Sequence, residues 1–333
     1  MAYTTIDNPE LYFQCKLYSG NNSTNAITFD GDEDMSPNMV WLKGRSGADN
    51  HRLYDTLRST SSLVPNDNRV EQADGNFSSF NSDGFTITGT DTGWNGSGET
   101  YVAWCWKEVS GIFDIITYSG TGSNMDVSHN LSAVPAFFAI KNRDVDQAWR
   151  VYHKNMTIAD PYSTRMVFSE TGSQSTSALG LDADPTSSVI NIGTGTGCTN
   201  ASGEDFVCYA RKEIKAFSKF SSYVGNGSTN GPYINLGFRA SFFLYKSIDT
   251  GSEEWKILDN KRDPFNRGSQ RNIHVNSSSA ESDDTNSIGE FLSNGVKIRS
   301  SHNNINKSGD NYIFMAFAEQ PFVNSKGVPA NAR

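Results

Sequence analysis

The sequence predicts an all-β protein made of three tandem antiparallel β-sandwich modules of the jelly-roll or lectin-like kind. Three observations support this fold class: the composition, the short apolar runs bounded by turn residues, and an internal repeat of roughly one hundred residues. The repeat carries the most weight, because self-similarity at a fixed period reflects one structural unit copied along the chain.

The composition indicates short strands joined by many turns. The 333 residues are 36% hydrophobic and 12% aromatic, and Ser, Thr, Asn and Gly are abundant. Few aliphatic residues with many aromatic and turn-forming ones are typical of β structure. Disorder is excluded because disordered chains are poor in aromatic and β-branched residues. The length suits two or three domains.

Four sequence features recur in the same order three times. The strings YSGNNS, YSGTGS and YVGNGS begin at Tyr18, Tyr118 and Tyr223. Each is followed by an apolar run that ends in a lysine: Lys43, Lys141 and Lys246. The runs LYD, WRVYH and WKILD come next, and each copy closes with a Ser-Gly turn before an apolar run, with glycines at 98, 203 and 309.

The repeat divides the chain into five parts. We predict an N-terminal tail at 1–11, modules at 12–110, 111–215 and 216–322, and a C-terminal tail at 323–333. The joins contain no Pro-rich or Gly/Ser-rich linker, so neighbouring modules are expected to touch.

Within each module, apolar runs of five to eight residues favour buried strands over helices. Turn signals precede strands at Ser82 to Ile87 and at Ser293 to Ile298. Helical periodicity is scarce, and one short helix is expected at RLYDTLRS from Arg52. No sustained heptads occur, so no coiled-coil shaft is predicted.

Charge and cysteine usage limit the partners. The net charge is −9 and no basic stripe exists, so nucleic-acid binding is not expected. No signal peptide and no long apolar stretch are present, so membrane insertion is not expected either. Cys105 and Cys208 lie in strand-like runs, which indicates buried free thiols and folding in a reducing cytoplasm; the remaining cysteines are Cys15 and Cys198.

No catalytic signature for a hydrolase, metalloprotease or nucleotide-binding enzyme is present, so we expect a non-enzymatic protein without a cofactor. Five histidines lack metal-ligand spacing and are expected to be surface or turn residues. They are His51, His129, His153, His274 and His302.

The acidic stretch from Asp30 to Asp34 allows two interpretations. Alternating aspartates could supply the first oxygens of a calcium site. However, Met35 replaces the glycine and Trp41 the twelfth-position glutamate of an EF-hand loop. A solvated loop is favoured, and calcium is left open.

Positions repeated in every copy are assigned to module architecture rather than to an active site. They are Glu108, Glu213, Glu319, Asn95, Asn200 and Asn306. Recognition is sought in residues that differ between copies, where aromatic rings beside polar groups can stack on sugars. These are Trp94, Tyr162, Glu281 to Asp284, and DNKRDPFNR from Asp259. Packing between modules or subunits is the alternative for them.

Several strings resemble repeat modules in virion proteins of marine tailed bacteriophages, commonly described as tail-fibre-like or structural. They are MAYTTIDNPELYFQ, YVGNGSTNGP, VWLKGRSGADNHRLYDTLRS, SGETYVAWCWKE and LDNKRDPF, and the resemblance covers roughly residues 1 to 322. It implies a phage particle component with a lectin-like sandwich fold and no enzymatic activity. It implies no particular binding residues.

Three functions follow as alternatives. The first is a tail or tail-fibre adhesin that binds host surface glycans and forms a homo-oligomer, commonly a trimer. The second is a capsid decoration or cement protein of the phage head. The third, with the least support, is a glycan depolymerase, whose paired carboxylates would be adjacent only in space. All three place the protein on the outer surface of the virion, beside other virion proteins, after synthesis in the host cytoplasm.

Overall fold

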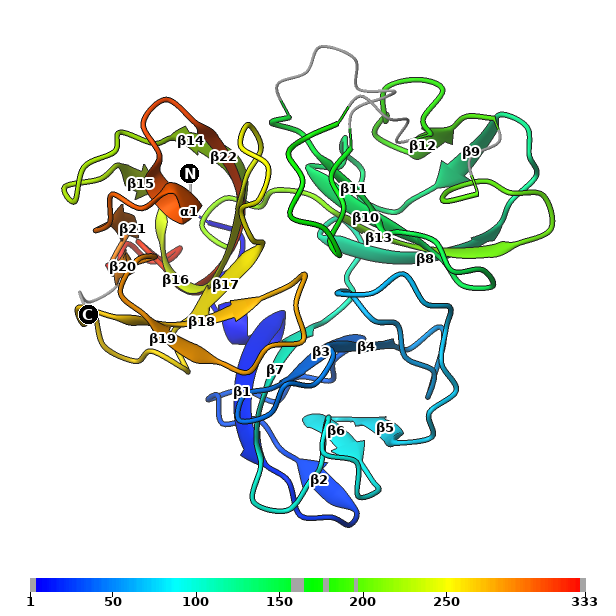
Figure 1. Cartoon of the computed structure of the whole chain (residues 1–333), viewed down its shortest axis with the longest axis horizontal. Coiled ribbons are helices and arrows are strands. Elements are labelled where there is room, and N and C mark those ends of the chain that lie inside the picture. The colour runs from blue at the N-terminus through cyan, green and yellow to red at the C-terminus, as the bar shows by residue number, and fades with distance from the viewer. Residues whose placement is uncertain (1–3, 157–164, 176–179, 195–196, 330–333) are drawn as a thin grey trace.

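The computed structural model describes residues 4–156, 165–175, 180–194 and 197–329. In this part of the chain the protein is nearly all β, which confirms the predicted fold class. All pairs of named strands are antiparallel, and the sheets form three lobes around a common centre (Figure 1).

The first lobe contains a sheet of order β1-β7-β3-β4 and a small sheet of order β2-β6-β5. Its elements are η1 (Pro9–Leu11), β1 (Phe13–Ser19), β2 (Asn25–Ile27), β3 (Met39–Gly44), β4 (Arg52–Asp55), β5 (Phe77–Asn81), β6 (Gly84–Ile87) and β7 (Thr100–Trp106). The second lobe pairs a sheet of order β8-β13-β10-β11 with the ribbon β9-β12. Its strands are β8 (Phe113–Ser119), β9 (Met125–Ser128), β10 (Phe137–Asn142), β11 (Arg150–His153), β12 (Val189–Ile192) and β13 (Asp205–Arg211).

The third lobe repeats this order as β14-β22-β16-β17 and extends the sheet by β18 and β19, beside a small sheet of order β15-β21-β20. Its elements are β14 (Ser218–Val224), β15 (Tyr233–Asn235), β16 (Phe238–Ser247), β17 (Lys256–Asp259), β18 (Gln270–His274), β19 (Ser282–Asp284), β20 (Gly289–Leu292), β21 (Gly295–Ile298), α1 (Asn303–Asn306) and β22 (Asn311–Pro321). Strands β6 and β21 follow the two turns expected from the sequence.

The closing strands carry apolar residues on both faces, and the two faces pack into different cores. In β7, Val102, Trp104 and Trp106 point into a central core, whereas Tyr101 and Cys105 point into the outer core of the first lobe. This division follows from the two-residue period of a strand. The central core includes side chains from all three lobes, so neighbouring lobes pack together as expected from the absence of linkers.

Three equivalent ring N–H groups close the lobes into a cycle. In each case a ring N–H of one lobe donates a hydrogen bond to a backbone carbonyl of the preceding lobe. For the ring of the first lobe, the acceptor lies in the third lobe. The bonds run from Trp149 Nε1 to Val64 O (3.0 Å), from Trp255 Nε1 to Val167 O (2.8 Å), and from His51 Nε2 to His274 O (3.0 Å). Each group is buried, so each bond replaces hydration lost on folding.

Two of the three repeated lysines, Lys43 and Lys141, bind a neighbouring lobe, and all three make one hydrogen bond in common. Their Nζ atoms are buried and donate to the carbonyl of the next residue, at 2.7 Å for Lys43 and Lys141 and 2.6 Å for Lys246. Lys43 also donates to the Ser278 carbonyl of the third lobe, and Lys141 to the Asn68 carbonyl of the first lobe. Burial lowers the pKa of all three lysines to about 8.

The prediction of a short helix at RLYDTLRS is wrong. Arg52 begins β4, which pairs with β3, and the strand ends at Asp55. The Asp55 carboxylate accepts hydrogen bonds from the backbone N–H groups of Leu57 and Arg58, both at 3.0 Å. A side chain that binds its own backbone in this way stabilises a turn rather than a helix.

All four cysteines are free and buried, which agrees with the expectation for Cys105 and Cys208. Burial raises the pKa of both of these thiols. None of the helices in the described ranges is long and apolar enough to span a membrane.

The repeated asparagines stand at the turns before the closing strands, as predicted, but their side chains bind the loop that follows the first strand of the same lobe rather than their own turn. Asn200 Oδ1 accepts from the N–H groups of Thr121 (2.7 Å) and Gly122 (3.3 Å). Its Nδ2 donates to the carbonyls of Ser123 (2.6 Å) and Gly193 (2.8 Å). Asn95 and Asn306 are also fully buried and make equivalent bonds.

Removing one of these asparagine side chains should destabilise the protein. We expect Asn200→Ala to lower the free energy of unfolding by about 1–3 kcal/mol, because it leaves buried backbone groups without partners. Asn191→Ala is the control, since its amide donates to Asp126 Oδ1 (2.8 Å) in an exposed position, and its effect should stay within about 0.5 kcal/mol. Urea unfolding measures both changes in free energy, and equal effects of the two variants would contradict the stabilising role of the Asn200 hydrogen bonds.

Candidate functional site

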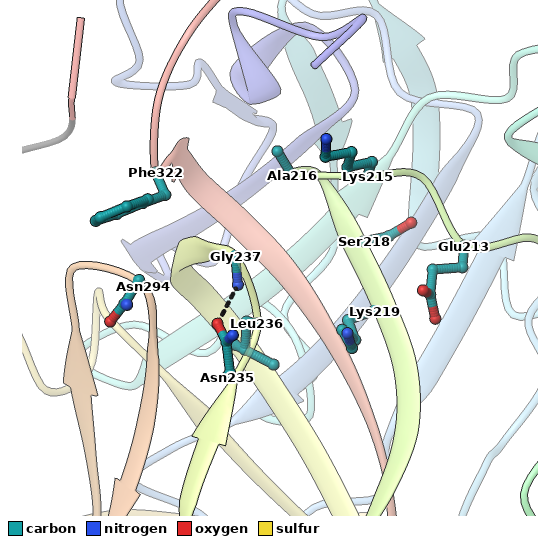
Figure 2. Close-up of a pocket in the computed structure, with 10 residues that line it drawn as sticks. All are labelled: Glu213, Lys215, Ala216, Ser218, Lys219, Asn235, Leu236, Gly237, Asn294 and Phe322. Atoms are coloured by element: carbon teal, nitrogen blue, oxygen red, sulfur yellow. Dashed lines mark hydrogen bonds between the residues drawn. The ribbon is translucent and has the colours of Figure 1, made fainter. Parts of the chain in front are cut away.

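A surface cavity of about 590 Å³ lies beside the connection that leads from the second lobe into the third (Figure 2). This volume lies within the range of small-molecule sites. Its lining residues are Glu213, Lys215, Ala216, Ser218, Lys219, Asn235, Leu236, Gly237, Asn294 and Phe322. They come from the connection and β14, the end of β15 and the turn after it, the β20–β21 hairpin, and the residue that follows β22.

The cavity exists because one connection is short. In the second lobe, residues 129–136 join β9 to β10, and this loop packs on the connection from the first lobe. There, Asn130 accepts from Gly111 N through its carbonyl (2.7 Å) and donates from its own N–H to Asp114 Oδ2 (2.6 Å). In the third lobe only Leu236 and Gly237 join β15 to β16, so this connection is too short to cover the place as its counterpart does.

One wall of the cavity is fixed by hydrogen bonds. The Asn294 carbonyl accepts from the N–H groups of Leu236 and Gly237, both at 3.0 Å, and its Oδ1 accepts from Tyr233 OH at 2.5 Å. Asn235 Oδ1 accepts from Gly237 N at 3.1 Å, the bond drawn in Figure 2. Both amide oxygens are therefore engaged internally, whereas neither Nδ2 group has a hydrogen-bond partner among the described residues.

The opposite wall contributes charge. Glu213 Oε2 accepts from Lys154 Nζ at 2.8 Å and from Phe220 N at 3.2 Å, so this carboxylate is already paired within the protein. Lys215 and Lys219 line the cavity on the same side. Phe322 is half-buried and adds an aromatic surface. The cavity thus offers mainly donors and a ring, a set suited to a ligand rich in acceptor oxygens.

Most recognition candidates from the sequence lie elsewhere and have internal roles. Trp94 is only 4% exposed, and the Arg52 guanidinium lies 4.9 Å from its ring centroid. The interpretation of Trp94 as a sugar-stacking residue is therefore wrong, because its ring is covered. Tyr162 lies outside the described residues.

The stretch from Glu281 to Asp284 forms contacts between and within lobes. Glu281 forms an ion pair with Arg45 of the first lobe at 2.9 Å, and its N–H donates to the Arg45 carbonyl at 2.8 Å. Asp284 pairs with the buried Lys256 at 3.1 Å. Both residues therefore serve packing within the protein, which is the alternative to recognition that the sequence left open for this stretch.

The segment from Asp259 combines buried and exposed residues. Asp259 is buried and forms an ion pair with Arg262 at 2.5 Å, whereas Phe265 is 78% exposed. Arg267 holds the loop through Asp263 and Asp283, at 3.0 and 2.9 Å. Phe265 is thus a ring in contact with water on a braced loop, outside the cavity.

The expectation that every histidine is a surface or turn residue is wrong for two of them. His51 and His153 are buried between lobes, and His153 Nε2 donates to the Phe314 carbonyl at 3.1 Å. In both rings Nδ1 accepts a hydrogen bond, from Trp41 Nε1 (2.9 Å) and from Asn155 N (3.1 Å) respectively. Burial lowers the pKa of His51 to about 3 and of His153 to about 4.

The acidic stretch lies in an exposed loop. Asp30 pairs with Lys261 of the third lobe at 2.8 Å and with Lys16 at 3.5 Å. Across the described ranges, no group of three His, Cys, Asp or Glu residues has the arrangement of a metal site.

The repeated glutamates have structural positions. Glu108 Oε1 accepts from Ile115 N at 2.8 Å, which is the counterpart of the bond between Glu213 and Phe220 N. Glu319 instead pairs with Arg239 at 3.1 Å. Of these three glutamates, only Glu213 lines the cavity.

Sequence reasoning missed Asn235, Asn294 and Phe322. A signal was available for the first of them, because alignment of the copies shows that the third has the shortest connection after its second strand. The other two come from a hairpin and from the end of the repeat, and only the fold brings them together.

The fold and the site define an all-β sandwich protein with a donor-rich cavity on its third lobe. The chain belongs to the family described as a domain of unknown function (DUF7483), whose model matches residues 8–321. No curated protein matches the chain.

Proposed function

We propose that this protein is a non-enzymatic component of the outer surface of a tailed bacteriophage, and that its third-lobe cavity binds a host surface saccharide. One observation carries the saccharide assignment: the cavity combines the Phe322 ring with the amide groups of Asn235 and Asn294. A ring face packs against the C–H groups of a sugar while amides bind its hydroxyl oxygens. The phage assignment is supported by the sequence resemblance.

Binding is favoured over hydrolysis at this cavity. Glycoside hydrolysis uses two carboxyl groups, roughly 5–10 Å apart, on either side of the scissile bond. Glu213 is the one carboxylate among the residues that line the cavity, and it is engaged by Lys154.

Two variants test the saccharide site. Phe322→Ala removes the stacking surface, and Asn235→Asp replaces a donor while preserving the acceptor for Gly237 N. We expect each to weaken binding about tenfold or more, measured by calorimetry with a saccharide found on a glycan array. Phe265→Ala removes an exposed ring outside the cavity and should leave affinity unchanged. A folded protein that binds no saccharide on the array would contradict the proposal.

A capsid decoration protein is the second candidate. It is favoured by the internal use of Trp94, Glu281 and Asp284, which leaves fewer residues for recognition. Cryo-electron microscopy of purified particles with a count of copies separates the two. A few copies to a few dozen at the tail would support host recognition, whereas hundreds on the head lattice would support decoration. Absence from particles would reject both.

A further inference from the structure

The connection that borders the cavity has a counterpart between the first and second lobes, which allows a position-by-position comparison. Glu108 and Glu213 each accept a hydrogen bond from the backbone N–H seven residues later. Three residues after each glutamate the backbone is left-handed, at Gly111 (φ 79°) and Ala216 (φ 64°). The two connections therefore have the same path.

The charges on these connections differ where the cavity differs. Two and six residues after the glutamate, the first connection has Ser110 and Asp114, whereas the second has Lys215 and Lys219. Ser110 and Asp114 bind the loop residue Asn130, which covers the first connection. Two lysines thus replace a neutral and an acidic residue in the copy whose β15–β16 connection is short.

This substitution is informative because the protein as a whole is acidic, with a net charge of −9. Clustered lysines at the rim of a concave surface raise the local positive potential and attract anions.

We infer that the ligand of this cavity is an acidic saccharide, one that bears a carboxylate or a sulfate group held by Lys215 and Lys219. This inference rests on the proposed saccharide site and specifies the chemical class of its ligand. The ring of Phe322 and the amides of Asn235 and Asn294 then bind the neutral part of the sugar.

The test compares acidic oligosaccharides, uronate-bearing and sulfated, with neutral partners of the same length, the methyl esters and the desulfated forms. We expect the acidic members to bind at least about tenfold more tightly, and the difference to shrink as salt rises from 0.05 to about 0.5 M. Lys215→Ser/Lys219→Asp, which installs the residues of the first connection, should abolish this preference, so that acidic and neutral members of each pair bind with similar affinity. Arg69→Asp, a charge reversal in a loop of the first lobe, is the control.

The outcomes separate the two claims. Equal binding of acidic and neutral members, unaffected by the double variant, would overturn the acidic assignment and leave the saccharide site standing. Binding of neither series by the folded wild-type protein would overturn the saccharide site itself. Circular dichroism and urea unfolding of the double variant establish that it folds.

Discussion

Replacing Asp55 by alanine is expected to lower the free energy of unfolding by about 3–5 kcal/mol, because it leaves a buried guanidinium without its main partner. Asp55 and Arg58 are both fully buried, with 2.7 Å between Oδ2 and Nη2. Tyr209 of the second lobe donates its hydroxyl to the same carboxylate oxygen at 2.5 Å. The variant therefore removes an ion pair and a contact between two lobes together.

The reason for this large effect is the asymmetry of buried charges. A buried pair contributes little net stability, but one partner left alone retains its full desolvation cost. Asp55→Ala/Arg58→Met should accordingly recover a large part of the loss. Asp67→Ala breaks the more exposed pair with Arg69 (2.5 Å) and should cost less than about 1 kcal/mol.

Urea unfolding of the four proteins measures these differences. A loss for Asp55→Ala no greater than that for Asp67→Ala would contradict the buried-charge argument. The third lobe offers a repeat of the experiment, because Asp259 pairs with Arg262 at 2.5 Å and accepts from Trp104 Nε1 of the first lobe at 3.0 Å.

Stability is expected to fall by several kcal/mol between pH 6.5 and about 4, in part because two histidines are buried as neutral rings. The pKa values of His51 and His153 in the folded protein are about 3 and about 4, below the ordinary value of 6.5. The unfolded chain therefore binds more protons than the folded chain in this window, and stability decreases as the pH falls. Above pH 6.5 both states are neutral at these positions, so the stability is fully present.

A pair exchange isolates the contribution of His51. Trp41 and His51 in the first lobe occupy the places of Ala139 and Trp149 in the second. The double variant Trp41→Ala/His51→Trp should keep a ring N–H for the carbonyl of His274 and remove the titrating group. His51→Trp alone should cost about 1–3 kcal/mol through overpacking beside Trp41.

Unfolding free energies at pH 7 and pH 4 measure this prediction. The double variant should lose less stability than the wild type over that interval, by an amount that reports the His51 contribution. An identical loss in both proteins would show that carboxylates and His153 account for the acid response.

The all-β class was predictable because strand periodicity and turn residues are local properties. The Asn-x-Ser-Gly motif shows both sides of this: its sequence indicated a turn, but the Asn200 side chain binds the backbone of residues 121–123, which the local sequence does not reveal. The short helix at Arg52 was mispredicted because Asp55 makes side-chain bonds to the backbone of Leu57 and Arg58, which local propensity does not reveal.

The cavity was less predictable than the fold. Lys215 and Lys219 lie near each other in the sequence, but Asn235, Asn294 and Phe322 are separated by up to 87 residues (322 − 235 = 87). No periodicity connects a turn, a hairpin and a chain end, so only the folded chain brings them to one surface. Trp94 shows the converse, because an aromatic residue in a polar loop resembled a recognition residue until its burial was known.

The sequence by itself determined that the chain is built from repeated β units and assigned the repeated asparagines and glutamates to module architecture, since local patterning and internal repetition suffice for both. Only the tertiary structure decided how the units close on one another. Arg211 occupies the position of Trp106 and Phe317 in the equivalent closing strands, and its guanidinium lies 3.6 Å from the centroid of the Phe113 ring. Such a buried cation depends on aromatic faces supplied by distant parts of the chain, and those long-range contacts are formed only on folding.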